Sequence, residues 1–295
     1  MVEHNLDDYI EQNKAIIHRE IRKYLDELAI PERLKSAMIY SIEAGGKKIR
    51  PILLIASYEA YGQDKDKVIS TAVALEMIHT YSLIHDDLPA MDDDDLRRGY
   101  PTNHIQFDEA TAILAGDALL TYSFEIIAND PKLSSDEKVE VMQMLSSHSG
   151  PKGMVSGQIL DMEAEKNPVS LAELENIHNL KTGKLLSFAI TSGAYLSKAT
   201  TEQMKHLSTF SYYLGLIFQV QDDILDVAGD ASKIGKPVGS DSNNAKSTYP
   251  KLLGMDGAIK QKQIYVDQAK EALQQAGAVE SYLFLLTDYL TQRDH

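Results

Sequence analysis

The chain contains no cysteine, and this absence restricts the chemistry open to it. Without thiols there can be no disulfide, no thiolate zinc site and no cysteine nucleophile. Any bound metal must then be held by oxygen or imidazole ligands, a ligand set that favours hard cations.

Long apolar runs and an excess of positive charge are also missing. No stretch approaches the roughly 18 uninterrupted apolar residues of a membrane span, and the start of the chain lacks the basic and apolar regions of a signal peptide. We therefore expect a cytoplasmic protein with no membrane span. The formal net charge of −15 argues against nucleic acid as a partner, because binding that polyanion requires surplus lysine and arginine.

Helical periodicity is the main signal along the chain, and alternating strand patterns are hard to find. Turn-forming residues delimit about ten helices. The longest are expected at about 66–88, 108–128, 170–197 and 201–227, where periodicity meets a helix breaker. No linker divides the sequence, so we predict an all-α fold in which residues 1–295 form a single large helical bundle with a central substrate cavity. The helices at 66–88 and 201–227 are nearly apolar all round, which predicts burial at the bundle centre.

Both of these central helices end in aspartates. Asp222 and Asp226 are four residues apart and so share one helix face, with Asp223 about 100° further round. Adjacent carboxylates on an apolar helix are costly unless a cation neutralises them, which indicates a ligand site. A solvated acidic helix end is the alternative.

The other acidic segment contains Asp86, Asp87 and Asp92. Pro89 forbids a regular helix through it, so the chain must bend, and a bend lets Asp92 return toward Asp86. An EF-hand calcium site is disfavoured because Arg97 stands where an EF-hand loop needs glycine. Magnesium suits two facing half-sites with few carboxylates, because the oxygens of a substrate diphosphate complete its coordination. A solvated acidic loop remains the alternative.

Basic residues lie close to glycines and to the acidic segments rather than being spread evenly. Lys47, Arg50 and Arg98 could bind a second anion, since lysine offers a point charge and arginine a fork that matches phosphate oxygens. Surface solvation explains each of them equally well when taken alone. The Gly45-Gly46 pair is either a close-approach element or a plain interhelical turn.

Eight motifs follow one another along the chain: GGKKIRP at 45–51, SLIHDDLPAMD at 82–92, DDLRRG at 94–99, LAGD at 114–117, GQ at 157–158, KTGKL at 181–185, FQVQDDILD at 218–226 and GK at 235–236. Together they resemble the trans-isoprenyl diphosphate synthases, the trans-prenyltransferases, and most of all the bacterial farnesyl diphosphate synthase (geranyltranstransferase) group. The resemblance covers essentially the whole chain as one polyprenyl synthase domain with the isoprenoid synthase fold. One departure is Lys48-Ile49, where the family usually has lysine or arginine followed by leucine.

The resemblance implies a homodimer that condenses isopentenyl diphosphate with dimethylallyl or geranyl diphosphate. It also implies magnesium, with about three ions per site once substrate has completed their coordination. The resemblance implies six metal residues, which are Asp86, Asp87, Asp92, Asp222, Asp223 and Asp226. For the allylic diphosphate and the reacting cation it implies Arg97, Lys181, Thr182, Gln219, Lys236 and Lys246. Catalytic roles are implied for all of these except Asp87, Asp223, Asp226 and Lys246.

The isopentenyl diphosphate pocket implied by the resemblance consists of Lys47, Arg50, His79 and Arg98. His79 shares a helix face with Asp86, although a lone histidine is more often structural. Metal and cations stabilise the departing diphosphate, and the allylic cation is then attacked by the partner's double bond. Residues 235–250 are expected to close over the site and exclude water.

Product length is expected to depend on the helix upstream of Asp86. Tyr81 and Ser82 lie about 6 to 7.5 Å before it along the axis, and the resemblance makes Tyr81 the floor of the cavity for a fifteen-carbon product. A core tyrosine is the alternative. A longer-chain synthase shares every motif except this floor, a terpene cyclase would not need the second anion pocket, and a non-catalytic subunit would usually have damaged aspartate motifs.

Overall fold

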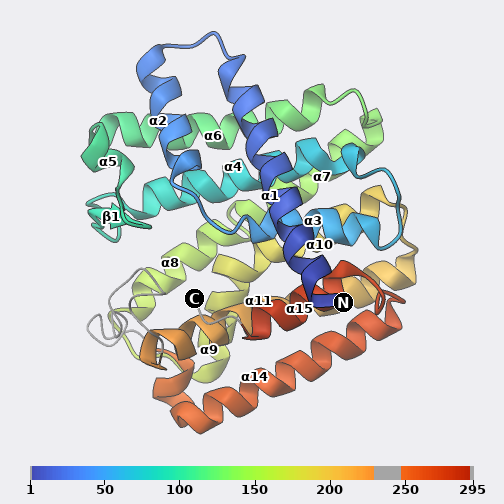
Figure 1. Ribbon diagram of the computed structural model, residues 1–295. Coiled ribbons are helices and arrows are strands. Elements are labelled where there is room, and N and C mark those ends of the chain that lie inside the picture. Colours follow the sequence, from blue (N-terminus) through green and yellow to red (C-terminus); the bar gives the residue numbers. More distant parts are fainter. Residues whose placement is uncertain (1, 229–246, 293–295) are drawn as a thin grey trace. The chain divides into compact units, whose positions relative to one another are not determined.

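The structure is a computed structural model that describes residues 2–228 and 247–292, with side chains described from residue 6 onward. It is almost entirely helical (Figure 1), and this confirms the all-α prediction. The expected lysines at 236 and 246, and most of the 235–250 segment, lie outside the described residues.

The chain divides into two compact units. The first comprises residues 1–55 and 65–142, and the second comprises residues 56–64 and 143–295. The prediction of a single bundle around one cavity is not tested by this division and stays a prediction. Two helices contribute to both units, α3 (Ile49–Glu59) and α7 (Ser135–Ser149).

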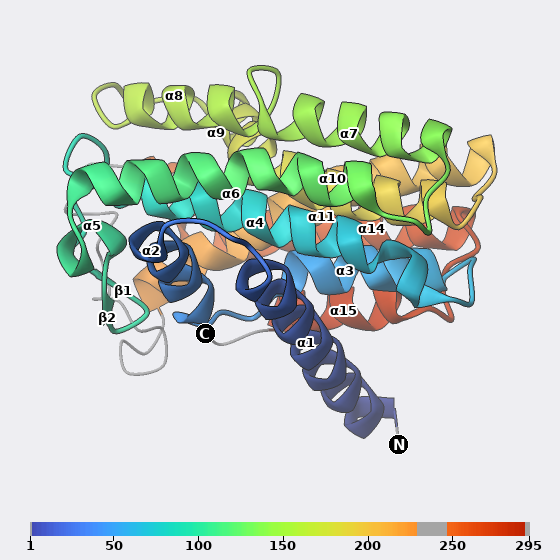
Figure 2. The ribbon, with the colours of Figure 1, turned by 90° about the horizontal axis from the view of Figure 1, so that it is seen from above.

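The first unit is built around the buried helix α4. In Figure 2, α6 runs alongside α4, and these two helices pack together. Most of the 18 residues in α4 have buried side chains, and the exceptions lie at its start and towards its C-terminal end. The predicted central burial of this helix is therefore confirmed. The elements of this unit, besides the first part of α3 and most of α7, are α1 (Val2–Asp26), α2 (Glu32–Glu43), a 3₁₀ turn (Lys65–Val68), α4 (Ile69–Asp86), β1 (Leu96–Arg97), β2 (Tyr100–Pro101), α5 (Asn103–Gln106) and α6 (Glu109–Asn129).

The second unit is centred on α11, which packs against α10, α14 and α15. Only part of this helix is apolar all round. Residues 214–217 and 220–221 are buried, whereas Thr201, Glu202 and Lys205 are exposed, so the prediction of all-round burial is wrong for its first half. The elements of this unit, besides the ends of α3 and α7, are α8 (Met154–Ala164), α9 (Leu171–His178), a π-helical turn (Asn179–Gly183), α10 (Lys184–Leu196), α11 (Thr201–Ala228), α14 (Tyr249–Gln275) and α15 (Tyr282–Gln292).

The helix boundaries follow the breakers in the sequence closely. The predicted helices at about 66–88, 108–128 and 201–227 correspond to α4, α6 and α11. Local capping explains where some begin: the Asp108 side chain accepts the Thr111 N–H at the start of α6, and Ser170 and Glu173 form a capping box at the start of α9. The helix predicted at 170–197 is wrong in one respect, since a π-helical turn interrupts it at Asn179–Gly183.

Candidate active site

The first aspartate segment begins where α4 ends. The last residue of the helix is Asp86, and Asp87 caps it. The chain then turns back, so that the Asp92 N–H donates to the Asp86 carbonyl over 2.9 Å. Pro89 lies inside this turn, where it cannot donate to a helical hydrogen bond. The predicted bend is confirmed, and it places the backbones of Asp86 and Asp92 side by side.

Asp87 and Arg97 form a partly buried ion pair at the base of this turn. The Arg97 Nε donates to both carboxylate oxygens of Asp87 over 2.8 Å, and its Nη2 also donates to Oδ1. Asp87 is only 3% exposed. Burial raises the pKa of the Asp87 carboxyl, against the lowering effect of Arg97. Asp87 therefore holds Arg97 in place, and its implied role toward metal stays a prediction.

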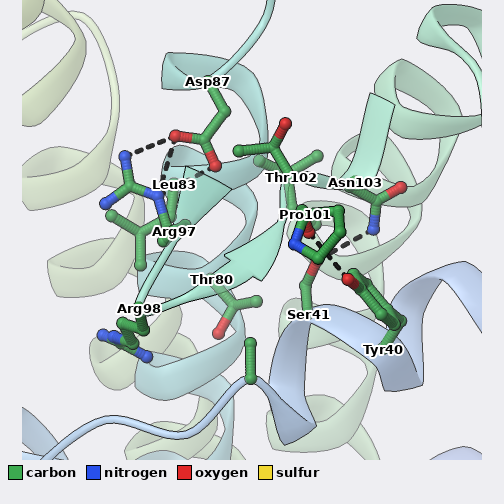
Figure 3. Close-up of a pocket in the computed structure, with 12 residues that line it drawn as sticks. Tyr40, Ser41, Thr80, Leu83, Asp87, Arg97, Arg98, Pro101, Thr102 and Asn103 are labelled. Atoms are coloured by element: carbon green, nitrogen blue, oxygen red, sulfur yellow. Dashed lines mark hydrogen bonds and ion pairs between the residues drawn. The ribbon is translucent and has the colours of Figure 1, made fainter. Parts of the chain in front are cut away.

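A short hairpin separates the two neighbouring arginines. β1 and β2 pair antiparallel around the loop Arg98-Gly99, whose φ values are 55° and 81°. Two positive φ values in a two-residue loop indicate a type I′ turn, which is matched to the twist of a hairpin. In Figure 3 the Arg97 guanidinium lies against Asp87, whereas that of Arg98 lies away from it. Two adjacent cations are thereby directed to different places.

The Gly45-Gly46 loop receives Arg98. The Arg98 Nη1 donates to the Gly45 carbonyl. A Cβ at position 46 would lie 2.4 Å from that nitrogen, and the φ of Gly46 is 111°. The backbone conformation therefore favours glycine at position 46, and a side chain there would displace the Arg98 guanidinium. A close approach is therefore seen at Gly46, whereas a Cβ at Gly45 would meet nothing within 4 Å.

His79 lies among positive charges. Arg50 Nη1 is 3.4 Å from His79 Nε2. Burial lowers the pKa of His79 well below its usual range, and the charges of Arg50, Arg98, Lys48 and Arg97 lower it further. A neutral imidazole can accept the Arg50 N–H through Nε2. The structure thus brings Arg50, His79 and Arg98 together, with Lys47 on the adjoining loop, and this concentration of cations favours binding of an anion.

This neutral histidine predicts a pH dependence of folding stability. Because the pKa of His79 is lower in the fold than the unfolded value of about 6.5, the unfolded chain binds the proton more readily. Stability contributed by neutral His79 is present above that pH and is lost as the pH falls below it. As the pH is lowered below about 6.5, we expect the free energy of unfolding of the wild type to fall more steeply than that of His79→Gln. The difference in slope is up to about 1.4 kcal/mol per pH unit.

Urea unfolding at several pH values between 5 and 8 measures this difference. His18→Gln is the matched control, since His18 is exposed on α1. Parallel pH profiles for the wild type and His79→Gln would contradict the prediction.

The second aspartate segment lies at the C-terminal end of α11. Asp223 is buried, and its Oδ2 accepts the Tyr249 N–H at the start of α14 over 2.9 Å. Asp222 and Asp226 are half-buried and share a helix face, as their spacing predicts. Asp223 therefore has a structural partner at the N-terminus of a helix, where a negative charge is stabilised.

Lys181 and Thr182 lie in the π-helical turn between α9 and α10. Lys181 Nζ donates to Asp161 Oδ2 of α8 over 2.6 Å, and Thr182 is buried. Two helices approach this turn through glycines. A Cβ at Gly157 would lie 2.2 Å from the Lys181 nitrogen, and one at Gly215 would lie 2.8 Å from the Gly183 Cα. Single π-helical turns are frequent at functional sites, and close packing on two sides fixes this one. Gln219 lies half-buried on α11.

The comparisons with known proteins agree with these features. The family model described as polyprenyl synthetase matches residues 31–284. The chain belongs to the polyprenyl synthetase family. It is 47% identical to the farnesyl diphosphate synthase of Bacillus subtilis, over 98% of this chain and 99% of that protein. It is 42% identical to the geranylgeranyl diphosphate synthase of Cyanophora paradoxa, over 99% of this chain and 97% of that protein.

A solved structure extends the likeness to the fold of this family. The geranyltransferase of Helicobacter pylori, complexed with magnesium and isoprenyl diphosphate, is 37% identical to this chain. The match covers 97% of this chain and 95% of that one, with a TM-score of 0.79. The resemblance inferred from the motifs is confirmed at the level of the family.

Carboxylate oxygens are the donors that this polyprenyl synthetase offers to a metal. Among the described residues, no three Asp, Glu or His side chains gather closely enough to enclose an ion. Each aspartate segment can supply one or two oxygens, which fits magnesium, because that ion keeps waters and takes the remaining ligands from substrate phosphates. The roles of the individual aspartates stay predictions.

The cavity beside the Asp87–Arg97 pair is too small to enclose a diphosphate substrate. It holds about 20 Å³ and is lined by Tyr40, Thr80, Leu83, Asp87, Arg97 and Arg98, among others (Figure 3). That volume suffices for about one water, whereas small-molecule pockets measure about 300–1,000 Å³. The cavity is a packing gap behind the ion pair.

Two structural features of the polyprenyl synthetase site were missed from the sequence. Lys48 and Glu76 form an almost fully buried ion pair, with 2.9 Å between Nζ and Oε1 and 4% and 3% exposure of the side chains. The sequence signal for this pair is a lone glutamate, Glu76, inside the apolar segment 69–86, because a buried carboxylate requires a positively charged partner. Gly157 belongs to the GQ motif at 157–158. Its close contact with the π-helical turn could not be predicted from the helical periodicity of the sequence.

Proposed function

We propose that the chain is a farnesyl diphosphate synthase. It condenses isopentenyl diphosphate head-to-tail with dimethylallyl and then geranyl diphosphate, and it releases (2E,6E)-farnesyl diphosphate and diphosphate. The observation that carries this proposal is the cationic cluster around His79 next to a complete aspartate segment, in a chain 47% identical to a farnesyl diphosphate synthase. One family model spans both compact units, which supports a single synthase domain.

The allylic diphosphate binds at the aspartate segments. Asp86, Asp92, Asp222 and Asp226 hold magnesium, with Asp87 and Asp223 as supports. Magnesium, when bound, supplies positive charge to the departing diphosphate. Arg97, held by Asp87, and Lys181 add fixed positive charge at the same group, and by family resemblance Lys236 and Lys246 do so too. These basic residues and the magnesium-binding aspartates can act on one diphosphate only if the two aspartate segments face each other, as this proposal requires.

The isopentenyl diphosphate binds at Lys47, Arg50, His79 and Arg98. The allylic C–O bond breaks and diphosphate leaves with the bonding electrons. The double bond of the second substrate then attacks the allylic cation, and the released diphosphate removes the proton. Thr182, the Lys181 carbonyl and Gln219 face the cation, and exclusion of water prevents its hydrolysis.

One assay tests the reaction. Purified protein is incubated with isopentenyl diphosphate, magnesium and dimethylallyl or geranyl diphosphate, and the dephosphorylated products are identified by mass spectrometry. We expect farnesol as the main alcohol, with no product when magnesium is chelated. Absence of condensation in the presence of magnesium would exclude the proposal.

A longer-chain synthase is the second candidate, since a geranylgeranyl diphosphate synthase is 42% identical to this chain. Tyr81 on α4 favours the shorter product. It is 7% exposed, and burial, together with the nearby Asp86 charge, raises its pKa to about 12. A neutral aromatic ring one to two turns before Asp86 suits an apolar cavity floor, with Ser82 beside it.

Tyr81→Ala is therefore expected to lengthen the product. Removing the ring opens space for at least one further five-carbon unit, so that geranylgeranyl diphosphate or longer chains become the main product. Product chromatography with geranyl diphosphate as the starter measures the change, and Tyr81→Phe is the control that keeps the ring. An unchanged product distribution in Tyr81→Ala would remove the floor assignment.

We also propose a cytoplasmic homodimer. α6 is long and apolar enough to cross a membrane by length and composition, and less than half of its apolar window is buried. Ile113 and Leu114 are exposed on it. Since α6 packs on the central helix α4 of a compact unit, contact with a second copy explains its exposed apolar side chains better than lipid does. Light scattering at micromolar concentration measures the oligomeric state.

A further inference from the structure

The imidazole of His85, next to Asp86 on α4, sits in a notch on α6. A Cβ at Gly116 would lie 2.2 Å from His85 Nε2 and 2.6 Å from its Cδ2, so the ring occupies the space that a side chain at this position would fill. His85 Nε2 is 3.1 Å from the Ile113 carbonyl, which accepts its N–H, and 3.9 Å from an Asp117 oxygen. The ring is thus fixed against the backbone of α6.

Tyr81 contacts another part of the same ring. The two ring centroids are 5.7 Å apart with an interplanar angle of 77°, an edge-to-face contact between residues one helical turn apart. The order of contacts is therefore the α6 backbone at Gly116, then His85, then Tyr81. A tyrosine held in this way has less room to rotate toward α6, because the space on that side is occupied.

We propose that Gly116 and His85 are specificity-determining positioning residues that fix product length by holding Tyr81 in place. This inference rests on the proposed function, in which Tyr81 is the floor of the product cavity. His85 acts through Tyr81 and touches no reacting atom in this proposal. Glycine at position 116 leaves room for the His85 ring, and the ring in turn prevents Tyr81 from moving away as the product grows.

The two residues should change product length in opposite directions. His85→Ala empties the notch, so Tyr81 can rotate into it and longer products increase. Gly116→Ala pushes the His85 ring toward Tyr81 and narrows the cavity, so that geranyl diphosphate accumulates. We expect each product ratio to change roughly two- to tenfold, the effect of gaining or losing one edge-to-face aromatic contact.

The test measures the ratios of ten-, fifteen- and twenty-carbon products in the full-length enzyme. His85→Phe keeps an aromatic ring in the notch and should give products close to those of the wild type. Gly257→Ala is the control for a glycine-to-alanine change that crowds a neighbour in a helix, because its added Cβ would lie 2.8 Å from the Leu253 Cβ, a contact within α14. It should leave the product ratios unchanged.

The double variant Gly116→Ala/His85→Ala decides whether the effect passes through His85. In the His85→Ala background the new methyl group meets no ring, so Gly116→Ala should change the ratios no further. Wild-type ratios in both single variants, or additive effects in the double variant, would overturn the inference while the proposed function stands. If the wild type condenses nothing, the proposed function fails, and this inference fails with it.

Discussion

Asp86→Asn is expected to lower kcat by about 10³-fold, because a metal ion's charge on the departing group contributes several kcal/mol and each tenfold in rate corresponds to about 1.4 kcal/mol. The substitution keeps the size of the side chain and removes its charge. It also leaves the Asp86 carbonyl in place to accept the Asp92 N–H, so the turn that joins the two residues should persist.

Asp93→Asn is the matched control for this prediction. Asp93 is exposed in the same acidic loop, and its φ of 54° is a conformation that asparagine also adopts readily. Steady-state kinetics at saturating substrate and over a series of magnesium concentrations separates weak metal binding from slow chemistry. Equal kcat values for the two variants would show that the Asp86 charge takes no part in catalysis.

Lys48→Met is expected to destabilise the fold by about 3–5 kcal/mol, the range for removing one partner of a buried ion pair. Glu76 is almost fully buried, and its Oε2 has no hydrogen-bond partner in the described structure. Once the ammonium is removed, the buried carboxylate loses its direct ion-pair partner. Lys48 has a positive φ of 51°, and methionine at that position meets the same backbone cost as lysine, so the difference reports the lost ion pair together with the 3.4 Å hydrogen bond from Lys48 Nζ to the Ile42 carbonyl.

The double variant Lys48→Met/Glu76→Leu tests the cause of the destabilisation. Replacing both partners by apolar side chains should restore most of the lost free energy of unfolding, since the desolvation cost is removed together with the attraction. Urea unfolding monitored by circular dichroism gives the values. A loss below about 1 kcal/mol in Lys48→Met would be typical of a solvent-exposed pair and would contradict the burial of this one.

Local sequence signals were sufficient for the helices and for the first aspartate segment. The boundaries of α4, α6 and α11 follow from periodicity and breakers, and Pro89 correctly predicts the turn between Asp86 and Asp92. The all-round burial of α11 was wrong in its first half, because the apolar average of the helix hides exposed Glu202 and Lys205.

Features that depend on contacts between distant segments could not be predicted from the sequence. Gly46 and Arg98 are far apart in the chain, and only the fold shows that one leaves room for the other. The same holds for Gly116 and His85, and for the Lys48–Glu76 pair. The resemblance of the KTGKL motif singled out Lys181 and Thr182 as site residues. The π-helical turn that contains them could not be predicted, because Gly183 is the only residue in 179–183 that disfavours a regular helix.

The π-helical turn at Asn179–Gly183 changes how the neighbouring sequence must be read on a helical wheel. An α-helix advances by about 100° per residue, and a turn with an i to i+5 hydrogen bond takes up one residue more than an α-helical turn. A single wheel drawn through residues 171–196 therefore misplaces every side chain of α10 by about 100° relative to those of α9. Deleting one residue from the turn is expected to restore a regular helix while keeping the buried faces of α9 and α10 aligned, whereas straightening the turn without a deletion would rotate one of those faces away from its neighbours.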